Sequence, residues 1–268
     1  MQSSSKPVEV EPDSARTIHD SRFTIHDSPA LITIRDLSSL RDYAACVELQ
    51  DSTWGAGFSE RVPTAILRVS QLIGGVAAGA FDDADRLVGF VFGMTGLRDH
   101  ELVHWSDMLA VREELRGQGI GEQLKQYQRD KVLALGVKSM LWTFDPLQAG
   151  NAHFNINHLG ALPIEYVKDM YGNTGSALHG TMPTDRFIVR WQLDPPSVPL
   201  GANTDPDTVR VEIPADFAAV RREGADAAMR WRLAIRERMA DLLGRGYRVV
   251  AFERPASGSP CYLLRHHA

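Results

Sequence analysis

The residues with the clearest chemical potential are residues 116–121, Arg-Gly-Gln-Gly-Ile-Gly. An apolar and aromatic run, residues 102–111, precedes them and favours a buried strand. After them, apolar residues recur at helical spacing until Gly136, which predicts a helix of about four turns. A helix N-terminus offers unpaired N–H groups and the positive end of the helix dipole. Glycines there let a pyrophosphate approach the amides, and Arg116 adds a positive charge, so the predicted chemistry is anion binding.

The spacing of the glycines indicates which kind of anion the loop binds. Neither the nucleotide P-loop, which ends in Gly-Lys-Ser/Thr, nor the dinucleotide pattern Gly-x-Gly-x-x-Gly is present. Arg116, Gly119 and Gly121 form Arg-x-x-Gly-x-Gly, which resembles the acyl-CoA-binding motif of the GNAT superfamily of N-acyltransferases. A tight turn whose glycines only relieve steric strain is the alternative. The resemblance implies these acyl-CoA contacts: Leu109, Ala110, Val111, Arg116, Gly117, Gln118, Gly119, Ile120, Gly121 and Asn151.

The resemblance covers about residues 31–193 and implies an α+β fold, a mixed, partly parallel twisted sheet flanked by helices. Two strands, residues 102–111 and 139–144, are expected to run parallel and to splay apart, with the pantetheine arm between them. The remaining elements follow from periodicity and turn signals. We expect strands at 31–35, 76–81, 87–95, 164–171 and 187–193, and helices after Ser38 or Ser39, after Pro63 and at 151–160.

Three residues are candidates for moving protons. His104 titrates near neutrality, whereas Asp107 needs burial to raise its pKa, and the two lie on opposite faces of a regular strand unless a bulge intervenes. The alternative for His104 is a hydrogen-bonded core histidine. In the resembled family a Tyr commonly serves as general acid for the thiolate, and Ile156 stands at that place here. Tyr171 is the candidate substitute, and Tyr166 is a further one.

An acceptor pocket is expected from residues around these strands. Trp54 lies in a loop rich in glycine and aromatic residues, where it borders the pocket or fills a gap in the core. Arg186 could bind an acceptor carboxylate bidentately while Asp145 or Asp185 receives the amine, or Asp185 and Arg186 could form a loop clasp. Asn155 could contact the acceptor or serve in helix capping. The long segment 172–186 suggests function by its length.

Composition restricts the partners. The net charge is −5 over 268 residues, which gives no broad cationic field for nucleic acid. Two cysteines are too few for a disulfide framework or a zinc site, so a cytoplasmic protein without a metal is expected. Apolar runs are too short to cross a membrane. We expect a small-molecule or peptide amine as acceptor and an acyl-CoA, such as acetyl-CoA, as co-substrate.

The chain divides into four segments by composition. Residues 1–30 are Ser-rich and predict a disordered arm, and residues 194–207 predict a Pro-rich linker. Between them, the resemblance implies a GNAT-like domain at 31–193, and residues 208–268 predict a small α/β extension. The helix of the extension, residues 225–243, has an apolar stripe of Trp231, Ile235, Met239 and Leu242, and we expect it to dock on the core or on a second subunit of a homodimer. Its arginines, at 230, 232, 236 and 238, are interpreted as a solvated face.

These observations favour an acyltransferase that moves a short acyl group to a primary amine in a ternary complex. A non-catalytic acyl-CoA sensor or interaction module is the alternative, because of Ile156 and the extension. A scaffold with a vestigial glycine loop is the third class.

Overall fold

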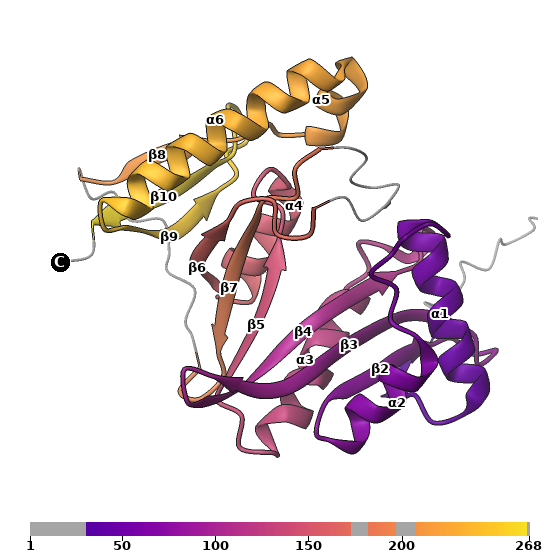
Figure 1. Ribbon diagram of the computed structural model, residues 1–268. Coiled ribbons are helices and arrows are strands. Elements are labelled where there is room, and N and C mark those ends of the chain that lie inside the picture. Colours follow the sequence, from indigo (N-terminus) through magenta and orange to yellow (C-terminus); the bar gives the residue numbers. More distant parts are fainter. Residues whose placement is uncertain (1–30, 173–181, 197–206, 267–268) are drawn as a thin grey trace, which may run out of the picture. The chain divides into compact units, whose positions relative to one another are not determined.

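A computed structural model describes residues 31–172, 182–196 and 207–266. Seven strands form one sheet in the order β1-β2-β3-β4-β5-β7-β6 (Figure 1). β4 and β5 are parallel, and the other neighbouring pairs are antiparallel. The predicted α+β fold with a mixed sheet is therefore confirmed. The strands are β1 (Thr33–Asp36), β2 (Val76–Phe81), β3 (Leu87–Arg98), β4 (Glu101–Val111), β5 (Ser139–Phe144), β6 (Leu162–Val167) and β7 (Arg186–Gln192).

Helices cover both faces of this sheet (Figure 1). α1 (Leu40–Trp54) and α2 (Thr64–Leu72) pack on one face, where their apolar residues share a buried cluster with Phe90 and Phe92 of β3. α3 (Ile120–Leu133) packs on the other face, against Val88 and Val91 of the same strand. The alternation of side chains along β3 thus sends one set to each layer. We call these two sides of the sheet the α1–α2 face and the α3 face.

A bulge interrupts the alternation along β4. Met108 is paired with Phe92 and Ser106 with Gly93, so Asp107 is an extra residue without a partner in β3. Such a bulge bends the strand and shifts the following side chains to the other face. Met108 accordingly packs on the α1–α2 face, although it is two residues from the α3-facing Ser106.

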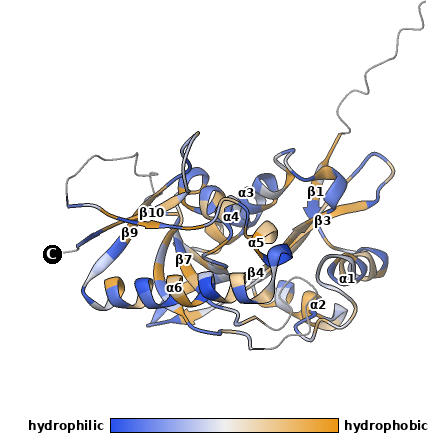
Figure 2. Cartoon of the chain, turned by 90° about the horizontal axis from the view of Figure 1, so that it is seen from above, coloured by the Kyte–Doolittle hydropathy of each residue, from blue (hydrophilic) through white to orange (hydrophobic). Residues whose placement is uncertain are grey.

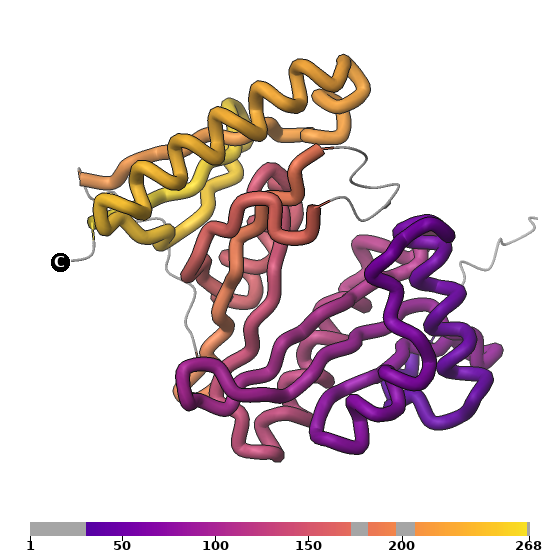
Figure 3. The backbone as a smooth tube through the Cα atoms, in the orientation of Figure 1, coloured from indigo at the N-terminus to yellow at the C-terminus, as the bar shows by residue number. Residues whose placement is uncertain are grey.

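β4 and β5 remain paired over a short length. The paired residues are His104 with Met140 and Trp105 with Leu141. Beyond them the two strands separate as they run toward their C-terminal ends, as the trace of the chain makes visible (Figure 3). The predicted splay of the two parallel strands is therefore present, and its narrow end, which we call the vertex, lies at residues 105 and 141.

Two further segments follow β5. α4 (Ala149–Ala152) leads into η2 (His153–His158), a π-helical turn that precedes Gly160 at φ 70°. Ile156, in the position where the resembled family commonly has Tyr, is buried in the α3-face cluster. A short 3₁₀ turn, η1 (Glu113–Leu115), connects β4 to the glycine loop.

The extension forms a second, three-stranded sheet with two helices. β8 (Val209–Glu212), β9 (Tyr247–Glu253) and β10 (Cys261–His266) are ordered β8-β10-β9, and α5 (Phe217–Glu223) precedes α6 (Ala225–Gly244). Asp216 caps α5 by accepting a hydrogen bond from the backbone N–H of Ala219 at 3.0 Å. Hydrophobic and hydrophilic residues alternate along α6 (Figure 2).

The buried side of α6 differs from the predicted one. Its buried residues are Ala228, Arg232, Ile235, Met239 and Leu242, at alternating spacings of four and three. Trp231, predicted in this stripe, is only partly buried, and Arg232, predicted as solvated, is 2% exposed. The reason is that Arg232 and Arg236 reach carboxylates of the core, which the helical pattern alone does not reveal.

The extension contacts the core through polar and apolar groups. The hydroxyl of Tyr262 donates to the carbonyl of Pro146 at 2.7 Å, and the amide of Asn157 donates to the carbonyl of Phe252 at 2.9 Å. One continuous buried cluster includes residues of β5, β7 and the extension. The extension therefore contacts the core of its own chain. The predicted arm at 1–30 and most of the linker at 197–206 lie outside the described residues, as do residues 173–181 of the long loop.

Candidate functional site

The glycine loop has the geometry that an anion site needs. Gly117 and Gly119 have φ of 79° and 80°, a region that favours glycine, and Gly119 is the N-cap of α3 without a side-chain cap. Residues 116–119 are exposed, so the N–H groups at this end face solvent. The Nε of Arg116 donates to the carbonyl of Val111 at 3.1 Å, which ties the guanidinium to the end of β4.

The other predicted cofactor residues surround this loop. Leu109, Ala110 and Val111 form the end of β4, beyond the vertex, and Ile120 and Gly121 begin α3, where Ile120 is buried. A side chain at Gly121 would meet only Leu109, at ordinary contact distance of 3.5 Å. Asn151 is exposed on α4, which follows the other splayed strand. Gln118 lies at the exposed tip of the loop.

On the α3 face a chain of hydrogen bonds joins β4 to α3. The Nζ of Lys125 donates to the Oγ of Ser106 at 2.7 Å, and that hydroxyl donates to the Oε1 of Gln128 at 2.8 Å. The amide nitrogen of Gln128 lies 3.0 Å from the Nε2 of His104 and can only donate to it. All four residues are buried, so these side chains satisfy one another inside the protein.

His104 therefore has both ring nitrogens occupied. Because Nε2 accepts from Gln128, the proton lies on Nδ1 and is donated to the Oγ1 of Thr95 at 2.9 Å. Thr95 donates in turn to the carbonyl of Gly74 at 2.6 Å. Burial, and then the charge of Lys125, lower the pKa of His104 to about 3. Of the two predicted base candidates, His104 is thus fixed in the core, with no lone pair left for an incoming proton.

Asp107 lies at the bulge and is open to solvent. Surrounding protein raises the pKa of its carboxyl by desolvation, the Nε1 of Trp105 lowers it by donating at 3.2 Å, and the charge of Glu60 raises it. The net pKa is raised. An accessible carboxyl with a raised pKa is a suitable candidate for a general base.

Tyr171 lies on the same side as Asp107. Its hydroxyl is 3.0 Å from the Oγ1 of Thr143 on β5, and burial raises its pKa, to which the charge of Asp107 also contributes. The guanidinium of Arg186 lies 5.5 Å from the centre of the Tyr171 ring. The structure therefore brings two of the three predicted catalytic residues within electrostatic range and leaves His104 behind the sheet. Tyr171 lies past the end of β6, and not within the strand as predicted.

The two predicted acceptor carboxylates are engaged by α6. Arg232 binds Asp145 with two hydrogen bonds, of 2.8 and 2.6 Å, and Arg236 binds Asp185 with two, of 2.9 and 2.6 Å. Asp185 is fully buried and also accepts from the hydroxyl of Tyr166 at 2.7 Å. These contacts correct the expectation that Asp145 or Asp185 receives the amine of the acceptor, because each carboxylate already has a cationic partner.

The other three candidates for acceptor binding lie in different parts of the fold. Arg186 is buried, donates to the carbonyl of Asp185 at 2.9 Å and lies 4.0 Å from Asp145. Asn155 is buried and accepts from the Nε1 of Trp142 at 3.1 Å, on the α3 face. Trp54 stacks on Phe58 with ring centres 5.7 Å apart, on the α1–α2 face.

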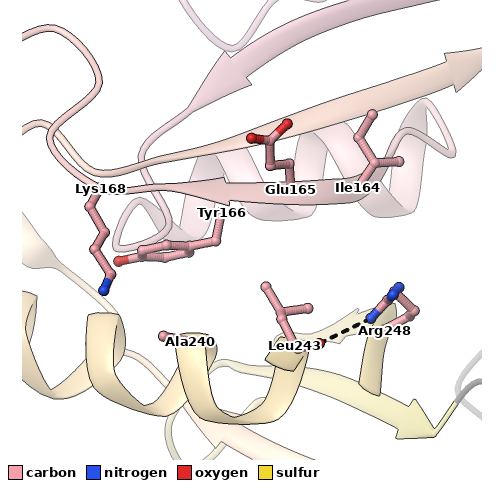
Figure 4. Close-up of a pocket in the computed structure, with 7 residues that line it drawn as sticks. All are labelled: Ile164, Glu165, Tyr166, Lys168, Ala240, Leu243 and Arg248. Carbon is pink, nitrogen blue, oxygen red and sulfur yellow. Dashed lines mark hydrogen bonds between the residues drawn. The ribbon is translucent and has the colours of Figure 1, made fainter. Parts of the chain in front are cut away.

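A shallow cleft marks the junction between β6 and the extension (Figure 4). Its volume is about 290 Å³, and within its lining Arg248 donates to the carbonyl of Leu243 at 3.3 Å. Of the predicted site residues it contains only Tyr166, whose hydroxyl is held by Asp185. The cleft is lined by Ile164, Glu165, Tyr166, Lys168, Ala240, Leu243 and Arg248.

Sequence reasoning missed Lys125. It is 4% exposed, and its Nζ lies 3.9 Å from the centre of the Trp142 ring. Burial lowers its pKa to about 7. A signal existed, because Lys125 lies seven residues before Val132, on the apolar side of the predicted helix.

The described residues also show neither a membrane-spanning helix nor a group that could bind a metal ion. In the described part of the chain no helix is long and apolar enough to cross a membrane. The same residues contain no group of three His, Cys, Asp or Glu side chains that could hold a metal ion.

Solved structures with a similar arrangement have low sequence identity. The ribosomal-protein-S18-alanine N-acetyltransferase from Escherichia coli is 16% identical, with 65% of this chain and 99% of that chain covered at a TM-score of 0.47. The protein yncA from Salmonella typhimurium, solved with its cofactor acetyl-CoA, is 18% identical, with 64% and 99% covered at 0.49. The NatC complex bound to Gag peptide and CoA contains a chain that is 16% identical, with 60% and 98% covered at 0.49.

A comparison with the curated proteins finds no match. The family model described as the acetyltransferase (GNAT) family matches residues 43–155. That range contains most of α1 and the strands β2 to β5, together with the glycine loop and α3. It therefore includes the splayed strands and the candidate anion site. Residues 43–155 are therefore similar to the GNAT family of acetyltransferases, over the segment that contains this site.

Proposed function

We propose that the protein transfers an acetyl or other short acyl group from an acyl-CoA to a primary amine of a small molecule or peptide. The amine attacks the thioester directly in a ternary complex. The observation that carries the proposal is the splay of β4 and β5 beyond residues 105 and 141, with the glycine loop at its wide end and Asp107 and Tyr171 beside it.

The glycine loop is the proposed pyrophosphate site. The exposed N–H groups at the start of α3 and the positive end of its dipole favour the two phosphates, and the guanidinium of Arg116 adds a charge. From there the pantetheine arm extends between β4 and β5. Leu109, Ala110 and Val111 line one side of that gap, and Asn151 lies after the strand on the other side.

Asp107 and Tyr171 are the proposed acid–base pair. At neutral pH a carboxylate takes the proton of the attacking amine, and the raised pKa of Asp107 brings it closer to the working range. Tyr171 stays protonated at that pH, because burial raises its pKa, so its hydroxyl can protonate the departing thiolate. Arg186, beside Tyr171, is the acceptor-site candidate that adjoins this pair.

A non-catalytic acyl-CoA sensor is the second candidate. It is favoured by Ile156, which is 3% exposed in the core and supplies no acid. The same loop would then bind acyl-CoA, and Asp107 would have no catalytic task.

Calorimetry and a thiol-release assay test the proposal together. We expect acetyl-CoA to bind with micromolar affinity, Arg116→Ala to weaken binding about tenfold, and free CoA to appear when amino acids, polyamines or peptides are supplied. Binding without acceptor-dependent release would favour the sensor. Absence of binding by any acyl-CoA would remove the proposal.

Asp107→Asn tests the assigned base once an acceptor is found. We expect kcat/KM to fall by about 10²- to 10⁴-fold, with loss of the acidic limb of the pH profile. Glu60→Gln is the matched control, because it should keep that limb and move it to lower pH by removing a repulsive charge. An unchanged limb in Asp107→Asn would exclude Asp107 as the base.

A further inference from the structure

Lys125 is a buried cation in an unusual place. It belongs to α3 and is 4% exposed, and its Nζ contacts the Oγ of Ser106 at 2.7 Å and the Trp142 ring at 3.9 Å. Ser106 is the first residue of β4 beyond the last pair with β5, and Trp142 is the first residue of β5 beyond it. The ammonium group of Lys125 therefore contacts one residue of each strand next to the vertex, on the α3 face.

No carboxylate compensates this charge among the residues that the structure describes. Lys125 forms none of the ion pairs between described residues, and its Nζ contacts a hydroxyl group and an indole ring. His104 is the titratable side chain that faces it, and that imidazole is neutral. A buried cation without an anion is costly, so such an arrangement is typical of a ligand site.

The vertex lies at the inner end of the gap between the strands. The glycine loop begins after Val111, at the wide end, and β4 runs six residues from Trp105 to Val111, a length of about 20 Å. A pantetheine arm that starts at the loop and follows β4 points its thioester toward the vertex. The part of the acyl group farthest from the sulfur then comes closest to Lys125.

We propose that Lys125 selects an acyl-CoA whose acyl group ends in a carboxylate, of the malonyl or succinyl class. This inference rests on the proposed acyl-CoA site and defines its donor more closely. The Nζ of Lys125 donates to the terminal carboxylate, and the hydrogen-bond chain through Ser106 and Gln128 holds the ammonium group at the vertex. A methyl group, as in acetyl, would leave the cation uncompensated.

Calorimetry on the full chain with malonyl-CoA, succinyl-CoA, acetyl-CoA and free CoA tests the proposal without the need for an acceptor. We expect malonyl-CoA or succinyl-CoA to bind at least about tenfold more tightly than acetyl-CoA, because a charge-assisted hydrogen bond forms in a dry site. Equal or tighter binding of acetyl-CoA would overturn this inference and leave the proposed function intact. If none of the four binds, the proposed function and the inference both fail.

Lys125→Met keeps an unbranched side chain that is one atom shorter and removes its charge. We expect the preference for the carboxylate-bearing donors to disappear while the affinity for free CoA changes less than twofold. A preference that persists in Lys125→Met would overturn the proposal, whatever its origin.

Proton uptake gives a readout that a structural lysine would not affect. Burial keeps Lys125 partly neutral near pH 7, and a bound carboxylate favours the charged form. At pH 8 the binding enthalpy of malonyl-CoA should therefore depend on the ionisation enthalpy of the buffer in the wild type but not in Lys125→Met. Buffer-independent enthalpies in the wild type would contradict the predicted pairing.

Discussion

Two buried cations of this protein have opposite surroundings. Arg232 of the extension, 2% exposed, makes two hydrogen bonds to the carboxylate of Asp145, and its guanidinium lies over the ring of Phe217. Lys125 of the core, 4% exposed, has a hydroxyl and an aromatic ring beside it and no carboxylate among the described residues. The first charge is neutralised within the fold, and the second is not.

The difference also appears in their protonation. Burial acts to lower the pKa of both groups, but hydrogen bonds and charge from Asp145 more than offset it for Arg232, whose pKa is raised. For Lys125 nothing offsets burial, and its pKa falls to about 7. A buried cation that forms an ion pair within the fold has a structural role. A buried cation without a counter-charge indicates a place for a ligand. The two residues should therefore respond to mutation with opposite signs.

Arg232→Ala should have the larger effect. Asp145, whose side chain is 14% exposed, would become a largely buried carboxylate without its main cation, and such a loss typically costs about 3–5 kcal/mol of unfolding free energy. Chemical denaturation measures this loss. In the double variant Arg232→Met with Asp145→Asn much of it should return, because no unpaired charge remains. A single variant as stable as the wild type would mean that the ion pair does not anchor the extension.

Lys125→Met should change stability in the other direction. Removal of a buried, uncompensated charge should raise the unfolding free energy of the ligand-free protein by about 1–4 kcal/mol at pH 7. In the wild type the folded state binds fewer protons than the unfolded state between about pH 7 and 10.5, so its stability should rise with pH across that window. The variant should lack that component, and denaturation at pH 6.5 and 9 measures it. A destabilised variant with an unchanged pH slope would indicate a purely structural lysine.

Local patterns were enough to predict the elements that surround the candidate anion loop. The glycine loop, the strand before it and the helix after it each depend on residues close in sequence, and β2 and β5 begin and end where predicted. The resemblance then implied that the strands at 102–111 and 139–144 run parallel, as β4 and β5 do. The fold and the candidate anion loop could be predicted together because the same short segment points to both.

Contacts between distant residues could not be predicted in the same way. Arg232 meets Asp145 across 87 positions and Arg236 meets Asp185 across 51, so an arginine on α6 looks solvated until the core is placed beside it. The bulge at Asp107 depends on the register with β3, and the sequence of β4 alone left both faces open. Lys125 was overlooked because a lysine on an apolar stripe is usually assigned to the edge of that stripe.

Tyr262→Phe tests the weakest of these contacts, a neutral hydrogen bond next to the ion pair of Arg232 and Asp145. The hydroxyl of Tyr262 is fully buried and donates to the carbonyl of Pro146, the residue after Asp145. Its loss leaves that carbonyl without this donor, so we expect a cost of about 1–2 kcal/mol, smaller than for Arg232→Ala because no charge is exposed.

Tyr247→Phe is the matched control for this prediction. Tyr247 is half-buried on β9, and its hydroxyl has no hydrogen-bond partner in the part of the chain that the structure describes, so its removal should change stability by less than about 0.5 kcal/mol. Thermal and denaturant unfolding of both variants measure the difference. Since Tyr262 lies between Phe187 of β7 and Phe252 of β9, its ring contacts survive in the variant and isolate the hydroxyl. Equal stabilities for the two variants would show that the extension is held by Arg232, Arg236 and apolar packing, and that the bond to Pro146 adds nothing to the anchor.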